Sequence, residues 1–319
     1  MISMSDEKFT RVDEIFQAMG TAVAVEITVA DAVDAAGKAR EAIKGVKDIF
    51  AENERIFSRF DPDSELSRIN ANIGKRTGVS EKMFEVLGLC LKFHELSEGY
   101  FDPRVLENLE KIGYDRDFRS NDLNRDGNQA IELSKITGVL ADDLVLGPEG
   151  NSIIVKKRID TTGIAKGCAV DEAARFLEQQ GFADFIVDAG GDMQARGVDA
   201  DGARWTVGIE GMEAGKLKLE LDDEGVATSG ISRKRWIVGD RKFHHLVNPK
   251  DPENFSYDIK TVTVIEKKTV EADGRAKVLV LMGKEKGIGF ADRNNIKALF
   301  LDYRGNVYLS KAMKEKILN

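Results

Sequence analysis

Asp160-Thr161-Thr162-Gly163-Ile164-Ala165-Lys166-Gly167 marks the point at which an apolar strand changes into a helix. Residues 152–155 and 158–159 upstream favour strand, and apolar residues downstream recur at helical spacing until Gly181. Backbone N–H groups converge at the start of a helix, so an acid, two hydroxyls and two glycines at this place suit a phosphate or a metal ion. A plain turn, in which the glycines only supply unusual backbone angles, would show the same pattern.

The glycines of this segment do not make a P-loop. That loop needs a lysine directly after its last glycine and then Ser or Thr, whereas Lys166 precedes Gly167 and Cys168 follows it. No G-x-G-x-x-G run opens a helix after a strand either, which argues against an NAD-type dinucleotide site. An ordinary P-loop nucleotidase is therefore disfavoured.

Composition indicates a globular, acidic protein. The 319 residues are 42% hydrophobic and 32% charged, so the chain can bury a substantial core as one large domain or two. The formal net charge is −8 and no long basic run occurs, so we expect no nucleic-acid partner. Cys90 and Cys168 are far apart and suggest neither a disulfide framework nor a thiolate metal site.

Export signals and membrane spans are not apparent in the sequence. Residues 1–8 carry acids without an apolar core of signal-peptide length, and no run of about 18 apolar residues occurs. We therefore expect a cytoplasmic protein with no membrane segment. An exported form with a trimmed N-terminus would look the same.

Strand and helix patterns mix along the chain without regular alternation. Residues 22–29 alternate with period two, which predicts a strand with Val23, Val25, Ile27 and Val29 facing the core. Helices are expected over about 39–57, over 81–97 before Gly99, and over 272–281. Further strands are expected at 185–187, 205–209, 217–221 and 261–265. The mixture predicts an α+β (mixed α/β) fold, with mixed sheets flanked by helices.

Residues 122–127 imitate the start of a calcium-binding EF-hand loop. The twelfth position of that loop needs a bidentate glutamate, but it falls on Leu133, and Glu132 comes one residue early. We therefore interpret this stretch as a turn rich in Asp and Asn.

Nine short segments, including the opening one, follow one another in a familiar order. They are residues 19–21 (MGT), 60–70 (FDPDSELSRIN), 99–103 (GYFDP), 160–171, 190–192 (GGD), 205–210 (WTVGIE), 227–230 (ATSG), 245–249 (HLVNP) and 272–276 (ADGRA). In this order they resemble the FAD:protein FMN transferase family (ApbE-like, formerly the thiamine biosynthesis lipoprotein family). The resemblance implies an ApbE-like fold as a single flavin transferase unit over 1–319, with 1–18 as an N-terminal extension and about 19–300 as the matching core. Many family members carry a lipid-anchor cysteine near the N-terminus, which this chain does not show.

The resemblance also implies a magnesium site. In the family, the position of Asp273 binds magnesium beside a diphosphate, and a backbone carbonyl at the position of Gly163 contributes as well; oxygen ligands of this kind suit a hard cation. The family's third position falls on Lys277, which has no acceptor and cannot ligate a cation while protonated. Lys277 could instead occupy the space of one magnesium and pair with a phosphate oxygen. A helix N-cap is the alternative role for Asp273.

A base and a flavin pocket complete the implied site. The chain has three histidines, and His245 stands at the family's histidine position; a neutral imidazole could take the proton of an acceptor threonine. A packed or edge-strand histidine is the alternative, as it is for His94. Asn248 replaces the usual Asp. The flavin is expected against Met19, Phe60, Tyr100, Phe101, Asp102 and Val247, with Asp160 and Lys166 near its polar parts.

The implied function is a magnesium-dependent transfer of FMN from FAD to a Thr or Ser hydroxyl of an acceptor protein, with release of AMP. FAD is the substrate and magnesium the cofactor. Two alternatives use the same pocket: a FAD pyrophosphatase that gives FMN and AMP, and a FAD-binding protein without catalysis, which the departures at Lys277 and Asn248 favour.

Overall fold

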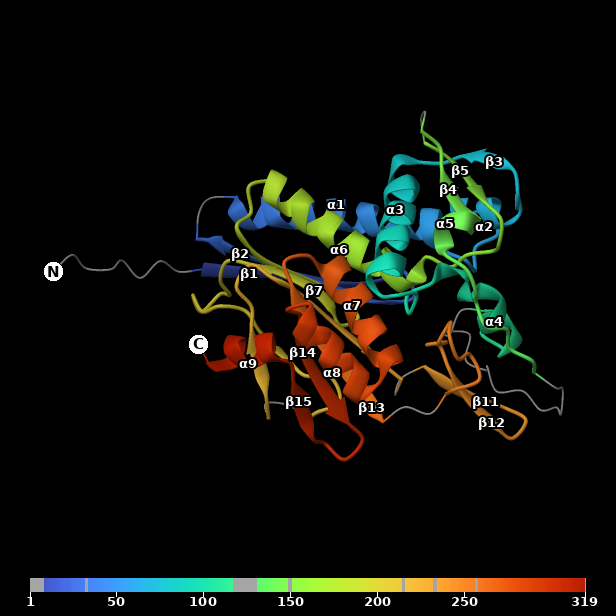
Figure 1. Ribbon diagram of the computed structural model, residues 1–319. Helices are drawn as coiled ribbons and strands as arrows, with labels where there is room; N and C mark the ends of the chain where they lie inside the picture. The colour runs from blue at the N-terminus through green and yellow to red at the C-terminus, as the bar shows by residue number, and fades with distance from the viewer. Residues whose placement is uncertain are drawn as a thin grey trace.

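An eight-stranded antiparallel sheet forms the centre of the computed structural model (Figure 1). The structure describes residues 9–31, 34–116, 131–148, 151–213, 216–231, 234–255 and 258–318. The strand order is β1 (Phe9–Ala18), β2 (Thr21–Ala30), β6 (Asp184–Ala189), β7 (Asp192–Arg196), β10 (Gly225–Gly230), β13 (Ile259–Glu266), β14 (Lys297–Asp302) and β15 (Val307–Leu309). The EF-hand-like stretch 122–127 and residues 1–8 lie outside the described residues.

Strand β2 has the facing predicted by its alternating pattern. Val23, Val25, Ile27 and Val29 are all buried, and the strand pairs with β6 on one side and with the whole of β1 on the other. Residues 9–18, placed outside the family core, are thus an edge strand of the main sheet.

Three helices cover one face of the sheet: α1 (Ala35–Phe57), α6 (Thr162–Gln179) and α7 (Thr269–Met282). Apolar side chains of α1 and α6 pack on β1, β2 and β6, and those of α7 pack on β10 and β13. Helix α8 (Lys284–Arg293) follows α7 and contacts β14. The other face packs against β8 (Thr206–Gly208), β9 (Lys218–Glu220) and α9 (Lys311–Leu318) through a separate apolar cluster that includes Trp205 and Met313.

Helix α7 begins three residues earlier than its sequence pattern indicates, so the alternative role of Asp273 as an N-cap is wrong. The N-cap position is Lys268, and Asp273 lies in the second turn. The first turn is capped from another helix, because the Asp171 carboxylate of α6 accepts hydrogen bonds from the backbone N–H groups of Thr269 (2.7 Å) and Val270 (3.1 Å).

A smaller unit packs beside the main sheet. It consists of α2 (Glu65–Asn70), α3 (Glu81–Leu96), α5 (Leu140–Asp143) and the sheet β3 (Arg76–Gly78), β5 (Ser152–Val155) and β4 (Leu144–Leu146). Residues 158–159 were expected to be strand but belong to no strand; the backbone N–H of Ile159 donates to the Asn70 side chain of α2 and not to a neighbouring strand. Nearby lie the 3-10 helix η1 (Pro103–Val105), helix α4 (Leu106–Lys111) and the hairpin formed by β11 (Arg235–Val238) and β12 (Arg241–His244).

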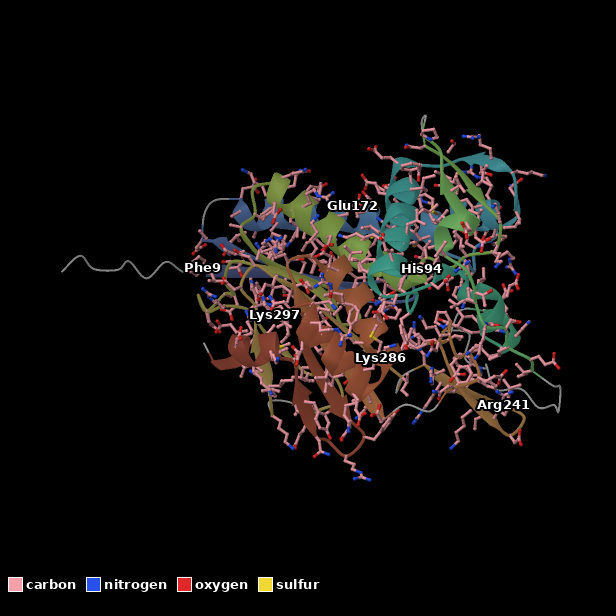
Figure 2. All side chains as sticks on the ribbon, in the orientation of Figure 1. Phe9, His94, Glu172, Arg241, Lys286 and Lys297 are labelled. Carbon is pink, nitrogen blue, oxygen red and sulfur yellow. The ribbon has the colours of Figure 1, made fainter. Side chains whose placement is uncertain are left out.

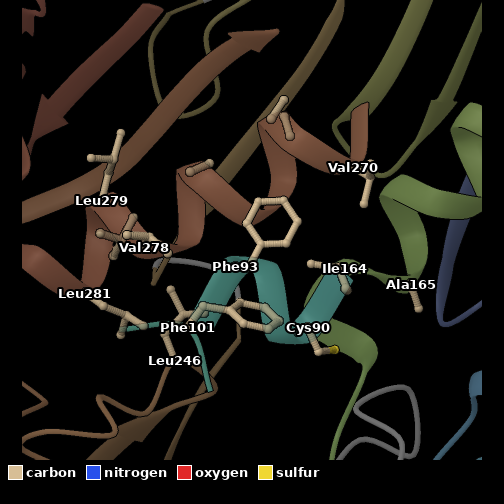
Figure 3. Close-up of a cluster of buried hydrophobic side chains, with 14 of the residues drawn as sticks. Cys90, Phe93, Phe101, Ile164, Ala165, Leu246, Val270, Val278, Leu279 and Leu281 are labelled. Atoms are coloured by element: carbon tan, nitrogen blue, oxygen red, sulfur yellow. The ribbon is translucent and has the colours of Figure 1, made fainter. Parts of the chain in front are cut away.

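An apolar cluster joins α3 to α6 and α7 (Figure 3). Phe93 projects from α3 toward α7, where a Cβ on Gly274 would come within 2.7 Å of its ring, and Cys90 lies near Ile164 of α6. Burial raises the pKa of the Cys90 thiol, which behaves as a small apolar side chain. This packing fixes the starts of α6 and α7 relative to each other.

The fold class expected from the sequence, α+β with sheets flanked by helices, is confirmed. All strand pairs between named strands are antiparallel in the described part of the chain. None of the helices described has the length and apolar character needed to cross a membrane.

Candidate active site

A cavity of about 400 Å³ opens where the starts of α6 and α7 meet the β1–β2 turn and the segments around residues 57–60, 100–105 and 245–249. All twelve residues singled out from the sequence line it: Met19, Phe60, Tyr100, Phe101, Asp102, Asp160, Gly163, Lys166, His245, Val247, Asp273 and Lys277. The fold thus brings together side chains that are up to 258 positions apart in the sequence, from Met19 to Lys277.

The floor of the cavity lies where α6 crosses α7. The helices approach so closely that a Cβ on Gly167 would lie 2.6 Å from Val270 Cα. This crossing sets Gly163 of α6 beside Asp273 and Lys277 of α7. Lys277 Nζ donates hydrogen bonds to the Gly163 carbonyl oxygen and to Asp273 Oδ1, the latter at 3.2 Å.

Asp273 keeps one oxygen without a partner. The residue is 4% exposed, and its Oδ2 is buried with no hydrogen-bond donor among the described residues. An orphaned, buried carboxylate oxygen is costly, so this atom is set up for a donor or a cation that arrives with a ligand.

A second ion pair, between Lys166 and Asp192, lies beside the first. Burial works to lower the pKa of Lys166, but the carboxylates of Asp192 and Asp273 outweigh it and raise that pKa. Burial and then the charge of Asp273 raise the pKa of Asp192. Asp192 belongs to the GGD motif, which alone gives it no role; its partner Lys166 lies on α6, which the fold places beside β7.

Asp160 organises the entrance to α6. Its Oδ1 accepts a hydrogen bond from the Thr162 backbone N–H at 2.8 Å, and its Oδ2 lies 3.2 Å from Arg59 Nε. The Arg59 guanidinium in turn lies over the rings of Phe60 (4.1 Å) and Tyr114 (4.4 Å). Arg59 was not predicted, although it directly precedes the FDPDS motif; it fixes one aromatic wall of the cavity.

The Asp102 carboxylate has structural partners. It accepts hydrogen bonds from Arg104 at 3.0 and 2.7 Å, and it lies 3.2 Å from His94 Nδ1. Burial alone would raise its pKa, but the bonds from His94 and Arg104 outweigh burial and lower it. His94 is packed, because its Nε2 accepts a bond from the backbone N–H of Leu140 at 3.2 Å.

Two lysines stand at the aromatic rim. Lys286 of α8, labelled in Figure 2, donates to the Tyr100 hydroxyl at 2.9 Å, and its ammonium lies 4.5 Å from the ring centre. Lys250 lies 5.1 Å from the same ring. Phe101 packs on Phe93, with ring centres 5.7 Å apart.

His245 is half-buried in the cavity wall. Burial lowers its pKa well below the usual value, and the charge of Lys234 adds to this effect. Its Nδ1 is buried without a hydrogen-bond partner in the described part of the chain. Asn248 does not orient this ring; its Oδ1 accepts from the Lys250 backbone N–H, and its Nδ2 donates to the Leu281 carbonyl.

Met19 has an unusual backbone conformation. Met19 and Gly20 form the two-residue turn between β1 and β2, with φ values of 48° and 75°. Turns of this kind favour Asn or Gly at the first central position, because a long side chain is strained there. From this turn Met19 lines the cavity.

Comparisons with known proteins agree with the motif order. The ApbE family model matches residues 19–300. The chain is 29% identical over 252 residues to a FAD:protein FMN transferase of Vibrio cholerae, covering 76% of this chain and 74% of that protein. A Haemophilus influenzae FAD:protein FMN transferase is 26% identical over 288 residues, with 86% and 81% covered.

Solved structures show the same architecture. The flavin transferase ApbE from Vibrio cholerae is 25% identical, with a TM-score of 0.79 over 96% of this chain and 99% of that one. The ApbE protein of Thermotoga maritima, at 21% identity, has a TM-score of 0.81 over 96% and 99%, and so shares the fold.

Proposed function

Because this chain belongs to the ApbE family, we propose that it transfers FMN from FAD to a Thr or Ser hydroxyl of an acceptor protein, with release of AMP. The observation that carries the proposal is the single cavity in which all twelve expected positions meet. Its two half-buried ammonium groups, aromatic rim and half-buried imidazole match the diphosphate, the rings and the proton that such a reaction must handle.

The reaction is a displacement at phosphorus. The acceptor hydroxyl oxygen attacks the phosphorus on the FMN side, the bond between that phosphorus and the bridging oxygen breaks, and AMP leaves with the bridging oxygen. The hydroxyl proton passes to a base. The product is FMN joined through a phosphoester to the acceptor side chain.

His245 is the proposed base. Its lowered pKa keeps the imidazole neutral near pH 7, so it is able to accept a proton. A bound diphosphate brings negative charge into the cavity, and that charge raises the pKa of the imidazole toward the working range. Its buried Nδ1 has no hydrogen-bond partner among the described residues.

Asp273 is the residue that would hold magnesium. The described residues contain no group of three His, Cys, Asp or Glu side chains that could hold a metal ion. Magnesium is commonly bound by one or two carboxylates together with substrate phosphates, so the free Asp273 Oδ2 fits an ion that arrives with FAD. The ion would neutralise diphosphate charge as AMP leaves. The Gly163 carbonyl oxygen accepts a hydrogen bond from Lys277 and keeps a second lone pair, which is the further oxygen proposed for the ion.

The flavin rings fit the apolar part of the cavity. Met19, Phe60, Tyr100, Phe101 and Val247 supply aromatic, thioether and aliphatic surfaces suited to a planar ring. Lys166 and Asp160 stand at the start of α6, on the side where polar parts of FAD meet backbone N–H groups.

The test incubates the protein with FAD, magnesium and an acceptor domain, with mass spectrometry of the acceptor and measurement of AMP. We expect one FMN on the acceptor for each AMP released. His245→Ala should bind FAD and transfer nothing. His244→Gln is the matched control, because His244 does not line the cavity and its ring packs against Phe255.

Other outcomes identify the alternatives. AMP and free FMN without labelling of the acceptor would show a FAD pyrophosphatase. Bound FAD without any AMP would show a binding protein. Full transfer by His245→Ala would remove the imidazole from the mechanism.

A further inference from the structure

We propose that the ammonium of Lys277 serves as a built-in cation at the diphosphate subsite and replaces one divalent ion there. The inference rests on the proposed function and adds to it the number of metal ions the site requires.

Lys277 Nζ lies between two oxygens that would otherwise suit a divalent cation. It donates to the Gly163 carbonyl oxygen and to Asp273 Oδ1, at 3.2 Å from the latter. The side chain is 19% exposed and lines the cavity. An ammonium has three donors, so a third N–H remains for a ligand atom in the cavity.

Little space is free around Gly163, beside the Lys277 ammonium. A Cβ at Gly163 would come within 3.2 Å of Phe101 Cε2 and 3.5 Å of Lys277 Nζ, so a glycine suits the crowded position beside this ammonium. Asp273 Oδ2 keeps its free coordination position, so the lysine takes one of the two carboxylate oxygens and leaves the other.

Lys277 supplies one of the positive charges that balance a bound diphosphate. Lys166 and Lys277 face Asp192 and Asp273, so the four formal charges on the cavity floor cancel before a ligand binds. A diphosphate then adds two negative charges in a partly buried place, where unpaired charge is costly. With Lys277 present, one magnesium on Asp273 Oδ2 balances the diphosphate; a neutral residue at position 277 would require a further cation.

The experiment measures FAD and ADP binding by titration calorimetry over a series of magnesium concentrations and in EDTA. The variants are Lys277→Thr, which provides an oxygen, and Lys277→Met, which keeps the aliphatic stem without charge. Lys92→Thr is the control, because Lys92 pairs with Glu271 of the same helix α7 at 3.4 Å but does not line the cavity. Circular dichroism checks that each variant is folded.

We expect both Lys277 variants to lose roughly ten- to hundredfold in FAD affinity in EDTA, the effect of one lost hydrogen bond to a charged group. Lys277→Thr should regain affinity as magnesium rises, with a slope of log affinity against log magnesium steeper by about one ion than in wild type. Lys92→Thr should match wild type.

Equal magnesium slopes in wild type and Lys277→Thr would overturn the inference, even if acceptor labelling proceeds. Unchanged FAD affinity of Lys277→Met in EDTA would also overturn it. Failure of the wild-type protein to bind FAD at all would overturn the proposed function and the inference together.

Discussion

Replacing Gly167 by alanine should force α6 and α7 apart and weaken both stability and the active site. The added Cβ would lie 2.6 Å from Val270 Cα, 2.9 Å from Val270 N and 3.1 Å from the Thr269 carbonyl carbon. These are backbone atoms, so no side-chain rotation relieves the overlap. The helices must move, and overpacking of this kind costs about 1–3 kcal/mol or more.

A matched variant isolates this cost. Glycine to alanine inside a helix gains about 1 kcal/mol from helix propensity, which partly hides the overlap. Gly289 of α8 receives the same gain without a clash, because the nearest atom to its added Cβ is Arg293 Nη1 at 3.5 Å. The difference in unfolding free energy between the two variants therefore measures the cost of the steric overlap at residue 167, about 1–3 kcal/mol.

Urea unfolding measures that difference, and both variants should retain the wild-type m value. The same displacement separates Gly163 from Asp273, so FAD binding should weaken in Gly167→Ala and not in Gly289→Ala. Equal unfolding free energies for the two variants would refute the close helix crossing and the account of how the cavity floor is built.

Four further changes test the site and the contacts that support it. Asp171→Ala removes the cap of α7 and should lower the unfolding free energy by about 1 kcal/mol, whereas Asp171→Asn should retain part of it; no change in urea would contradict the capping contact. Met19→Asn should raise stability by about 1 kcal/mol, because Asn tolerates a positive φ, while calorimetry shows weaker FAD binding; unchanged binding would exclude Met19 from the site. Asp102→Ala should cost about 1–3 kcal/mol in urea, because it removes two hydrogen bonds from buried Arg104, which keeps its ion pair with Asp143; an unchanged free energy of unfolding would contradict the Asp102–Arg104 pairing. Burial lowers the pKa of His244 to about 4, so on acidification the unfolded chain takes up a proton before the folded chain does. The free energy of unfolding should therefore be highest above about pH 6.5 and fall by at most about 3 kcal/mol toward pH 4. In urea titrations at several pH values, His244→Gln should show a smaller fall.

Local patterns in the sequence were enough to predict many elements. Strand β2 alternates cleanly because only one of its faces is buried deeply, and the apolar positions of α6 recur at helical spacing because one face packs on α1 and α7. Edge strand β1 has no such pattern, since most of its side chains are half-buried or exposed on both faces. The start of α7 was misplaced because its cap, Asp171, lies about a hundred residues earlier in the chain.

The site residues came from motif order, and their contacts came only from the structure. No sequence pattern showed that Asp192 pairs with Lys166, that Arg59 lies over Phe60, or that Lys277 bonds to Gly163. Each of these contacts joins elements that the sheet and its helices bring together in space. The roles assigned to the twelve lining residues stay predictions until the variants are measured.

The connection between β2 and β6 has a consequence for the order of folding. These neighbouring strands are separated by roughly 150 residues, so closing that loop costs about 3 kcal/mol more in chain entropy than closing the short loop between β14 and β15. We therefore expect hairpins such as β14–β15 to form early and the β2–β6 ladder to form late. The β1–β2 hairpin is itself local, but its turn reaches the cavity wall only when β2 pairs with β6, so the ability to bind flavin should appear only with this late step.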